Sequence, residues 1–160
     1  MPITNDWDMY SVLSKVMVKV IEDVTNLMMI ELEDSIEKNT YKFDYYPNVY
    51  YYNGRKTPTR QFEHAFHFDE IVNNMREVIA ELSYHWEEMD WDKETLHGND
   101  KDDMRERLAE LLNIDGLSGM KERQPYWDIF IDDMFQNGKL KRAFDQAIKV
   151  EFAKIGATVN

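Results

Sequence analysis

The chain has 160 residues, 43% of them hydrophobic, and contains no cysteine. This length and apolar content are sufficient for a core, so we expect a single domain over 1–160. The lack of cysteine excludes a disulfide scaffold, a Cys-ligated zinc site and a thiol nucleophile. The formal net charge of −12 argues against a general nucleic-acid binder, which needs a basic face to neutralise phosphates.

The sequence predicts neither export nor membrane insertion. Residues 1–6 lack the basic region and apolar core of a signal peptide. The longest apolar stretch, 16–30, does not suit a membrane span because three charged residues interrupt it. These are Lys19, Glu22 and Asp23. We therefore expect a cytosolic origin and no membrane partner.

Apolar residues recur at helical spacing from residue 10 to residue 36, which predicts one long amphipathic helix. Thr4, Asn5 or Asp6 can cap its start. Asn39 and Thr40 predict its end. Such a helix is longer than one small sheet can cover, so part of it is expected to be available to a neighbouring subunit. The apolar positions include Tyr10, Leu13, Met17, Val20, Val24, Leu27 and Ile36.

A tyrosine-rich segment follows this helix. Six of the nine tyrosines fall within 41–52, and a basic turn comes next. Tyrosine offers a large rigid contact area with a polar tip, so the segment suits a surface that contacts another protein. The alternative is an edge strand whose aromatic rings are half-buried against a helix. The residues predicted to contact a partner are Tyr45, Tyr50, Tyr51, Tyr52, Arg55, Lys56 and Arg60.

The pattern between residues 61 and 86 indicates strands. Residues 61–68 alternate in a way that predicts a strand. Residues 76–86 fit two patterns, because their apolar side chains alternate as in a strand and also mark one face of a helix. A hairpin through Asn73 and Asn74 is the favoured interpretation, and the helix is the alternative.

The segment 87–122 is predicted to be a surface excursion. Its first part, 87–103, holds eight acidic residues against Lys93 and Lys101. Such a run is usually a solvated loop. Together with the basic turn at 53–62, it also suits two complementary contact surfaces on copies of one chain.

Two helices are predicted near the C-terminal end. Pro125 suits the first turn of a short helix, which Asn137 and Gly138 end. A last helix carries apolar residues on one face, namely Leu140, Phe144, Ile148, Phe152 and Ile155. The expected core residues are Trp127, Phe130, Phe144 and Ile148. The predicted fold class is therefore α+β: a long N-terminal helix packed on a small antiparallel sheet, with short C-terminal helices.

No catalytic or metal-binding pattern stands out in the sequence. His85 could lie across a hairpin from His64 and His67, but on a strand these two would point to opposite faces and could not readily share one ion. Adjacent carboxylates such as Asp132 and Asp133 diverge on a helix or a strand. The chain has no Walker-type loop, no Gly-x-Ser-x-Gly turn and no dinucleotide fingerprint. We therefore predict that the protein is not an enzyme and has no cofactor or metal.

The order of the segments carries more information than any single motif. The long helix is followed by Tyr-Tyr-Pro-Asn-Val-Tyr-Tyr-Tyr at 45–52 and by Arg-Gln-Phe-Glu-His-Ala-Phe at 60–66. This arrangement resembles the tail-completion and neck proteins of tailed phages, in which a Tyr-x-Pro-x-x-Tyr segment runs into an Arg-Thr-x-x-Leu-x-x-Ser stretch. Phe62 stands for the Leu here and Ala65 for the Ser. The likeness extends to Leu-His-Gly at 96–98 and to 123–130.

This resemblance implies a small structural virion protein without chemistry of its own, assembled in the host cytoplasm. It would form a homo-oligomeric ring at the head–tail interface, with an adaptor protein on one side and a tail protein on the other. DNA would pass through the lumen without specific binding, since excess acid limits contact with phosphate. The alternative is an acidic DNA mimic or another regulatory protein-binding module, with carboxylates spaced like phosphates.

Replacing Arg55 and Arg60 together with Glu is expected to abolish ring assembly or docking, because the reversed charges no longer complement an acidic neighbour. The monomer should stay folded. Negative-stain imaging measures the assembly, and normal particles from the double variant would contradict the assignment.

Overall fold

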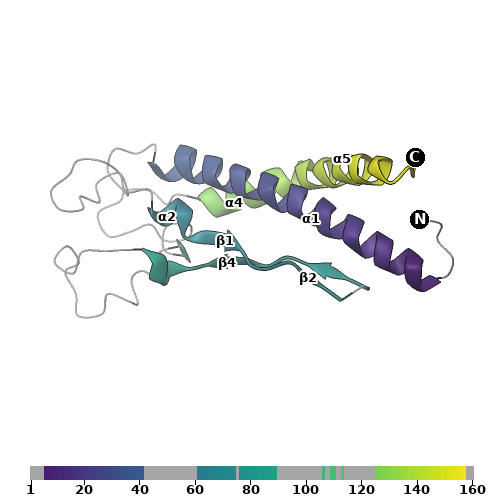
Figure 1. The fold of residues 1–160 in the computed structure, drawn as a ribbon. Coiled ribbons are helices and arrows are strands. Elements are labelled where there is room, and N and C mark those ends of the chain that lie inside the picture. The colour runs from purple at the N-terminus through teal and green to yellow at the C-terminus, as the bar shows by residue number, and fades with distance from the viewer. Residues whose placement is uncertain are drawn as a thin grey trace. The chain divides into compact units, whose positions relative to one another are not determined.

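The computed structural model describes residues 6–41, 61–74, 76–89, 106, 109, 110, 113 and 125–157. Figure 1 shows its elements in chain order: a long first helix, two short strand pairs and two C-terminal helices. This confirms the predicted α+β class. The strands form two separate two-stranded sheets.

The contacts of the chain gather into two compact units. The first contains Met1–Met29, Phe68–Ser83 and Asp133–Asn160, and the second contains Ile30–His67 and Tyr84–Asp132. The chain passes between them several times, so each unit is assembled from segments that are distant in sequence. The single domain over 1–160 stays a prediction.

Helix α1 (Asp6–Ile36) confirms the long helix predicted from the apolar spacing. It is followed by a π-helical turn, η1 (Glu37–Tyr41), so the helical backbone ends next to the predicted Asn39 and Thr40. The Asn39 side-chain amide donates a hydrogen bond to the Ser35 carbonyl oxygen at 2.9 Å. That bond satisfies one of the carbonyl groups that a helix end leaves without an intrahelical partner.

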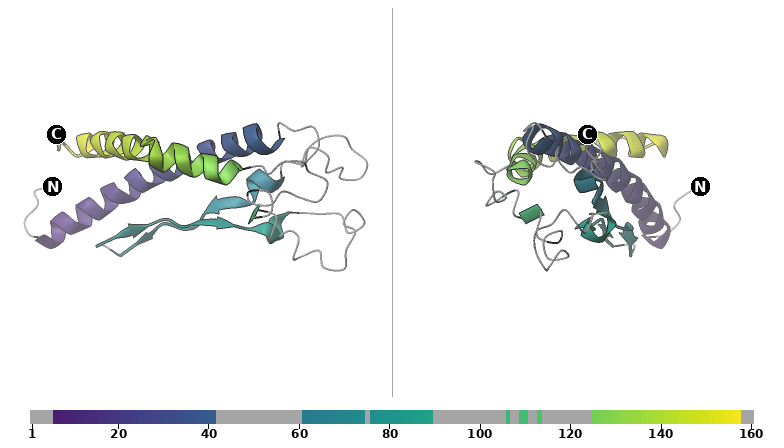
Figure 2. Two further views of the ribbon diagram at one scale, coloured as in Figure 1. Left: turned by 180° about the vertical axis from the view of Figure 1, so that it is seen from behind. Right: turned by 90° about the vertical axis from the view of Figure 1, so that its left-hand side faces the viewer.

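In the first unit, α1 packs against α5 (Lys139–Lys154), as both views of Figure 2 allow the reader to follow. Val16, Val20 and Val24 recur every fourth residue and are buried together with Ala147. Partly buried side chains surround this core, namely Met17, Met28, Leu140, Phe144, Ile148 and Phe152. The apolar face predicted for the last helix is therefore confirmed up to Phe152.

Ile155 was expected on the same apolar face, and that expectation is wrong. The helix ends at Lys154, and Ile155 is 48% exposed. Gly156 follows with a φ of 78°, a left-handed conformation that glycine adopts without steric cost. The backbone therefore leaves the helical path before Ile155 can continue the stripe.

The favoured hairpin is confirmed. Strand β2 (Val72–Asn73) pairs antiparallel with β3 (Val78–Ile79), with Val72 opposite Ile79. The Asn74 side-chain oxygen accepts hydrogen bonds from the backbone N–H groups of Arg76 and Glu77, at 3.1 and 2.9 Å. Asparagine stabilises tight turns in this way, and the turn lies later in the chain than predicted, because Asn73 itself belongs to β2.

The second strand pair joins β1 (Phe66–Phe68) to β4 (Leu82–Tyr84). Residues 78–79 and 82–84 are therefore strands, and the helical alternative is wrong there. A 3₁₀ turn, η3 (Trp86–Glu88), follows.

The strand predicted over 61–68 is wrong in its first half. Residues Gln61–His64 form a helical turn, α2, and the chain becomes extended only at Phe66. Phe62, Ala65 and Phe66 are all buried, at 3%, 1% and 5% exposure. Their spacing of i, i+3 and i+4 is helical. The spacing of the buried residues therefore agrees with the observed helical turn, whereas the aromatic content had suggested a strand.

In the second unit, helix α4 (Tyr126–Ile131) begins directly after Pro125, as predicted. Buried residues of this unit include Leu32, Ile36, Tyr126 and Phe130. The Ser35 hydroxyl donates a 2.6 Å hydrogen bond to the Tyr126 carbonyl oxygen, which joins the end of α1 to α4. Trp127 is only half-buried.

Helix α4 continues into a π-helical turn, η4 (Asp132–Gln136), and the chain turns at Asn137 and Gly138 as predicted. Gly138 has a φ of 68°. Within the described residues, no helix combines the length and the apolar character that crossing a membrane requires.

Phe130→Ala is expected to lower the free energy of unfolding by about 3 to 5 kcal/mol, because the ring is 2% exposed and its loss leaves a cavity. Phe135→Ala is the matched control. Phe135 is 53% exposed, so its loss should cost less than about 1 kcal/mol. Denaturant unfolding measures both values, and equal losses would contradict the assignment of Phe130 to the core.

Candidate functional site

The partner-contact residues predicted from the sequence lie outside the described residues. This applies to Tyr45, Tyr50, Tyr51, Tyr52, Arg55, Lys56 and Arg60. Their role in binding stays a prediction. The described residues contain two other features that bear on function, an apolar groove in the first unit and an aromatic cluster in the second.

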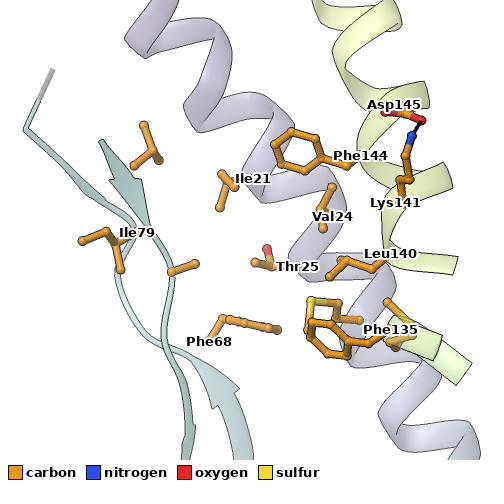
Figure 3. A pocket seen from close by; sticks show the side chains of 14 residues that line it. Ile21, Val24, Thr25, Phe68, Ile79, Phe135, Leu140, Lys141, Phe144 and Asp145 are labelled. Carbon is orange, nitrogen blue, oxygen red and sulfur yellow. Dashed lines mark hydrogen bonds and ion pairs between the residues drawn. The ribbon is translucent and has the colours of Figure 1, made fainter. Parts of the chain in front are cut away.

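The apolar groove is an open cavity of about 630 Å³ in the first unit. Figure 3 shows α1, the β2–β3 hairpin and α5 around it, with Phe68, the last residue of β1, directed toward the helices. The lining residues are Ile21, Val24, Thr25, Met28, Phe68, Val78, Ile79, Ala80, Met134, Phe135, Leu140, Lys141, Phe144 and Asp145.

The polar groups of the apolar groove are satisfied within the chain. The Lys141 ammonium and the Asp145 carboxylate form an ion pair at 2.6 Å. The Thr25 hydroxyl donates to the Glu22 carbonyl oxygen at 3.1 Å. A bound molecule would therefore gain chiefly from contact with carbon atoms.

The groove has a buried floor and an exposed rim. Val24 and Met134 are 4% and 0% exposed, whereas Ile79 and Phe135 are 48% and 53% exposed. Exposed apolar side chains next to an apolar groove are typical of surfaces that bind other molecules. The arrangement suits apolar side chains better than a polar substrate.

Sequence reasoning did not find the groove, although one signal was present. Met134 and Phe135 are adjacent in a helical turn, and neighbouring residues on a helix cannot point in the same direction. Burial of Met134 therefore leaves Phe135 outside the core. Phe135 lines a groove only because α1 and the β2–β3 hairpin lie next to it. The local sequence around Phe135 does not give the positions of those two elements.

The aromatic cluster lies in the second unit. Phe62 lies edge-on to Phe66 and to Tyr126, each at 5.4 Å between ring centroids. Tyr84 lies 4.9 Å from Phe66, and Trp127 stacks on Phe66 at 6.5 Å. Such pairs contribute beyond the area that they bury, so the cluster stabilises this unit.

Tyr126 is the most deeply buried ionisable member of the cluster. It is 1% exposed, and its hydroxyl donates a hydrogen bond to the Ala109 carbonyl oxygen at 3.2 Å. Burial raises the pKa of Tyr126 well above its ordinary value of 10.0, and nearby Tyr84 raises it further. The hydroxyl therefore stays protonated, which suits a structural role rather than acid–base chemistry.

Two histidines meet beside this cluster. The ring centroids of His67, on β1, and His85, which directly follows β4, lie 5.2 Å apart. His67 Nε2 lies 2.7 Å from a carboxylate oxygen of Glu88. His64 is in α2 rather than on a strand, so the argument from opposite strand faces does not apply to it. Across the part of the chain that the structure describes, no three His, Asp or Glu side chains gather closely enough to hold a metal.

Parts of the predicted surface excursion belong to the core of the second unit. Met89 is 1% exposed and Asn113 is 8% exposed. The Asn113 side-chain oxygen accepts from the backbone N–H groups of Trp127 and Asp128, at 3.1 and 3.2 Å. Asn113 thus satisfies donors at the start of α4 that lack intrahelical partners. At these two positions the excursion prediction is wrong, and over the undescribed part of 87–122 it stays a prediction.

Comparison with known proteins gives no relative. No protein-family model, no curated protein and no solved structure matches the chain.

The stability of the protein should fall above pH about 10 in part because of Tyr126. Its folded-state pKa lies above the unfolded-state value, so its contribution is complete below the unfolded pKa and is lost as the pH rises toward the folded pKa. The contribution of Tyr126 to the free energy of unfolding changes by at most about 1.4 kcal/mol per pH unit.

Tyr126→Phe should flatten this alkaline decline, because the group that ionises only in the unfolded chain is gone. Tyr10→Phe is the control, since Tyr10 is 50% exposed. Urea unfolding at several pH values between about 9 and 11 measures the slope. Identical slopes for the wild type and Tyr126→Phe would contradict the prediction.

An environment-sensitive apolar dye is expected to bind the groove, and Ala80→Phe should reduce its fluorescence because the added ring fills the cavity. Ala153→Phe places the same ring on an exposed position of α5 that does not line the groove. It should leave the signal unchanged. Equal fluorescence of all three proteins would show that the dye does not use this cavity.

Proposed function

We propose that this protein is a structural subunit of the neck of a tailed phage, where copies form a ring that joins the head adaptor to the tail. It acts by binding and positioning other proteins and carries no chemistry of its own. DNA passes through the lumen of the ring without specific binding.

The exposed apolar surface of the described residues carries this proposal. Several large apolar side chains are between 36% and 60% exposed, and two of them lie on the rim of the apolar groove. A ring subunit covers such side chains with its neighbours. They are Met9, Tyr10, Ile30, Val72, Ile79, Phe135, Val150 and Ile155.

The order of elements supports the same proposal. The resemblance to neck proteins depends on a long N-terminal helix, a hairpin and a closing helix. The described residues contain α1, the β2–β3 hairpin and α5 in that order. A mainly structural protein is also consistent with a deeply buried, protonated Tyr126 rather than a poised acid or base.

The distribution of charge favours a ring subunit over a DNA mimic. A mimic needs carboxylates over its exposed binding face. Helix α5 instead has five basic residues against two acidic ones in a chain whose net charge is −12. Opposite charges on separate elements suit association between copies.

Full-length protein is expected to assemble into closed rings of one size, visible by negative-stain electron microscopy and as one large species in sedimentation velocity. Heterologous contacts that close through a fixed rotation produce such rings. A monomer at every concentration, in low and in high salt, would contradict the proposed function. A monomer that competes with DNA for a basic DNA-binding protein would instead support the mimic.

A further inference from the structure

The β2–β3 hairpin and α5 present faces of opposite charge on opposite sides of the first unit. We infer that the outer face of the hairpin in one copy binds the outer face of α5 in the next copy. This inference rests on the proposed function, because it names the contact through which copies associate.

The outer face of the hairpin has an apolar centre. Val72 and Ile79 lie directly opposite each other in the antiparallel pair and are 56% and 48% exposed. Val78 and Ala80, on either side of Ile79, are half-buried in the lining of the apolar groove. Because side chains alternate along a strand, Ile79 is directed outward from this lining and reaches only the rim of the groove.

Acidic residues border this apolar centre. Glu77 and Glu81 lie two residues before and after Ile79, so they share its face of the hairpin. Glu77 accepts a hydrogen bond from the Asn74 side-chain amide at 2.7 Å, a neutral donor that leaves the carboxylate charge in place. Within the described part of the chain, the Glu81 carboxylate forms no ion pair.

The whole hairpin segment has a negative charge. Residues 68–83 contain four acidic residues against one basic residue, Arg76. Arg76 lies at the turn and reduces this charge without cancelling it. A partner for the outer face should therefore combine positive charge with apolar contact area.

The outer face of α5 has this combination. Arg142, Gln146 and Lys149 recur at i, i+4 and i+7, on the side of the helix opposite Phe144. Phe144 packs against the core that α5 shares with α1, so the three residues face away from that core. Val150 lies one turn after Gln146 and is 46% exposed.

Both cations of this face keep their charge. Arg142 donates a hydrogen bond to the Asn137 carbonyl oxygen at 2.8 Å, and a carbonyl oxygen is a neutral acceptor. Lys149 has no ion pair to any residue that the structure describes. The two acidic residues of α5 are paired with lysines of the same helix. Lys139 already takes part in another interaction, so the contact uses only Arg142 and Lys149.

The two faces point away from each other within one copy. The inner sides of the hairpin and of α5 both line the apolar groove, for example through Ala80 and Phe144 (Figure 3). The outer sides therefore lie on opposite sides of the first unit and cannot meet in the same copy. Two complementary surfaces on opposite sides of a subunit produce a heterologous contact, from which rings are built.

The two faces also match in length. Glu77 and Glu81 are four residues apart along the hairpin, about 13 Å at 3.3 Å per residue. Arg142 and Lys149 are seven residues apart on a helix, about 10 Å at 1.5 Å per residue. The long side chains of arginine and lysine can span the difference, so each cation can reach one carboxylate across an apolar centre. The chain thus carries both halves of one contact, which favours a second copy as the partner.

The test uses charge reversal in the full-length protein. Lys149→Glu reverses the basic face, and Glu81→Lys reverses the acidic face. Each single variant is expected to raise the concentration at which half of the protein is assembled by about tenfold or more, because like charges then meet. The double variant has opposite charges in every contact and should recover most of the wild-type assembly. Sedimentation velocity measures all four proteins.

Lys15→Glu and Glu33→Lys are the matched controls. Both positions are exposed on α1 outside the proposed contact, and the net charge changes by the same amounts as in Lys149→Glu and Glu81→Lys. Both controls should assemble like the wild type. Controls that weaken assembly as much as the contact variants would assign the effect to net charge and would overturn the contact.

Val72→Thr probes the apolar centre without changing any charge. Threonine is β-branched and suits a strand, and Val72 is 56% exposed, so the circular dichroism spectrum and the melting temperature should stay unchanged. Assembly should weaken several-fold, because apolar contact area is lost. Assembly of Val72→Thr at the wild-type concentration would contradict the proposed contact.

The outcomes separate the contact from the proposed function. Wild-type rings that persist in both single charge variants would overturn the contact and leave the ring. Open chains that the single variants disrupt and the double variant restores would support the contact and overturn the ring. Loss of assembly in the double variant as well would show that the two faces bind different surfaces, which overturns their pairing. A monomeric wild type would overturn both proposals.

Discussion

Helix α1 needs apolar partners along its whole length, and the rest of the structure depends on this constraint. A helix of 31 residues gains most of its stability from packing rather than from its own hydrogen bonds. In the first unit, Val16, Val20 and Val24 obtain this packing from α5. In the second, Leu32 and Ile36 are buried at 1% and 0% exposure.

The β2–β3 hairpin covers only part of the apolar surface that α1 and α5 present. Strands β2 and β3 pair with each other and with no third strand among the described elements. An isolated two-stranded hairpin is marginal in water and needs an apolar surface to pack on. Its contact with the helices is incomplete, which leaves the apolar groove open and keeps Ile79 and Phe135 half-exposed. The groove therefore follows from a sheet that is too small to cover two helices.

Charged residues next to the exposed apolar side chains restrict how those side chains can contact another surface. Exposed apolar residues alone would allow many associations, because hydrophobic contact is not directional. Val150 and Ile30 are 46% and 60% exposed beside charged residues of their own helices, and such charges restrict the orientations in which an apolar side chain can meet another surface. A net charge of −12 disfavours non-specific association with other acidic surfaces. The buried residues that stabilise the two units and the exposed apolar residues are thus different sets.

The sequence by itself determined the elements whose signal is long and regular. The apolar spacing of α1, the face of α5, Pro125 before α4 and the hairpin near Asn73 were all predictable, because local periodicity and turn chemistry specify them. The secondary structure of short segments was harder to predict, because few residues define their spacing. At 61–68 the aromatic residues suggested a strand, and only the burial of Phe62 and Phe66 selected a helical turn.

Only the tertiary structure decided which residues from distant segments share a surface. The sequence placed the candidate contacts at 45–60, whereas the described residues present a groove built from three separate segments and a cluster around Tyr126. Asn113 shows the same limit, since its role at the start of α4 depends on a contact with Trp127. Local pattern reports which side of an element is apolar. What covers that side, or leaves it open, depends on long-range packing that no single segment encodes.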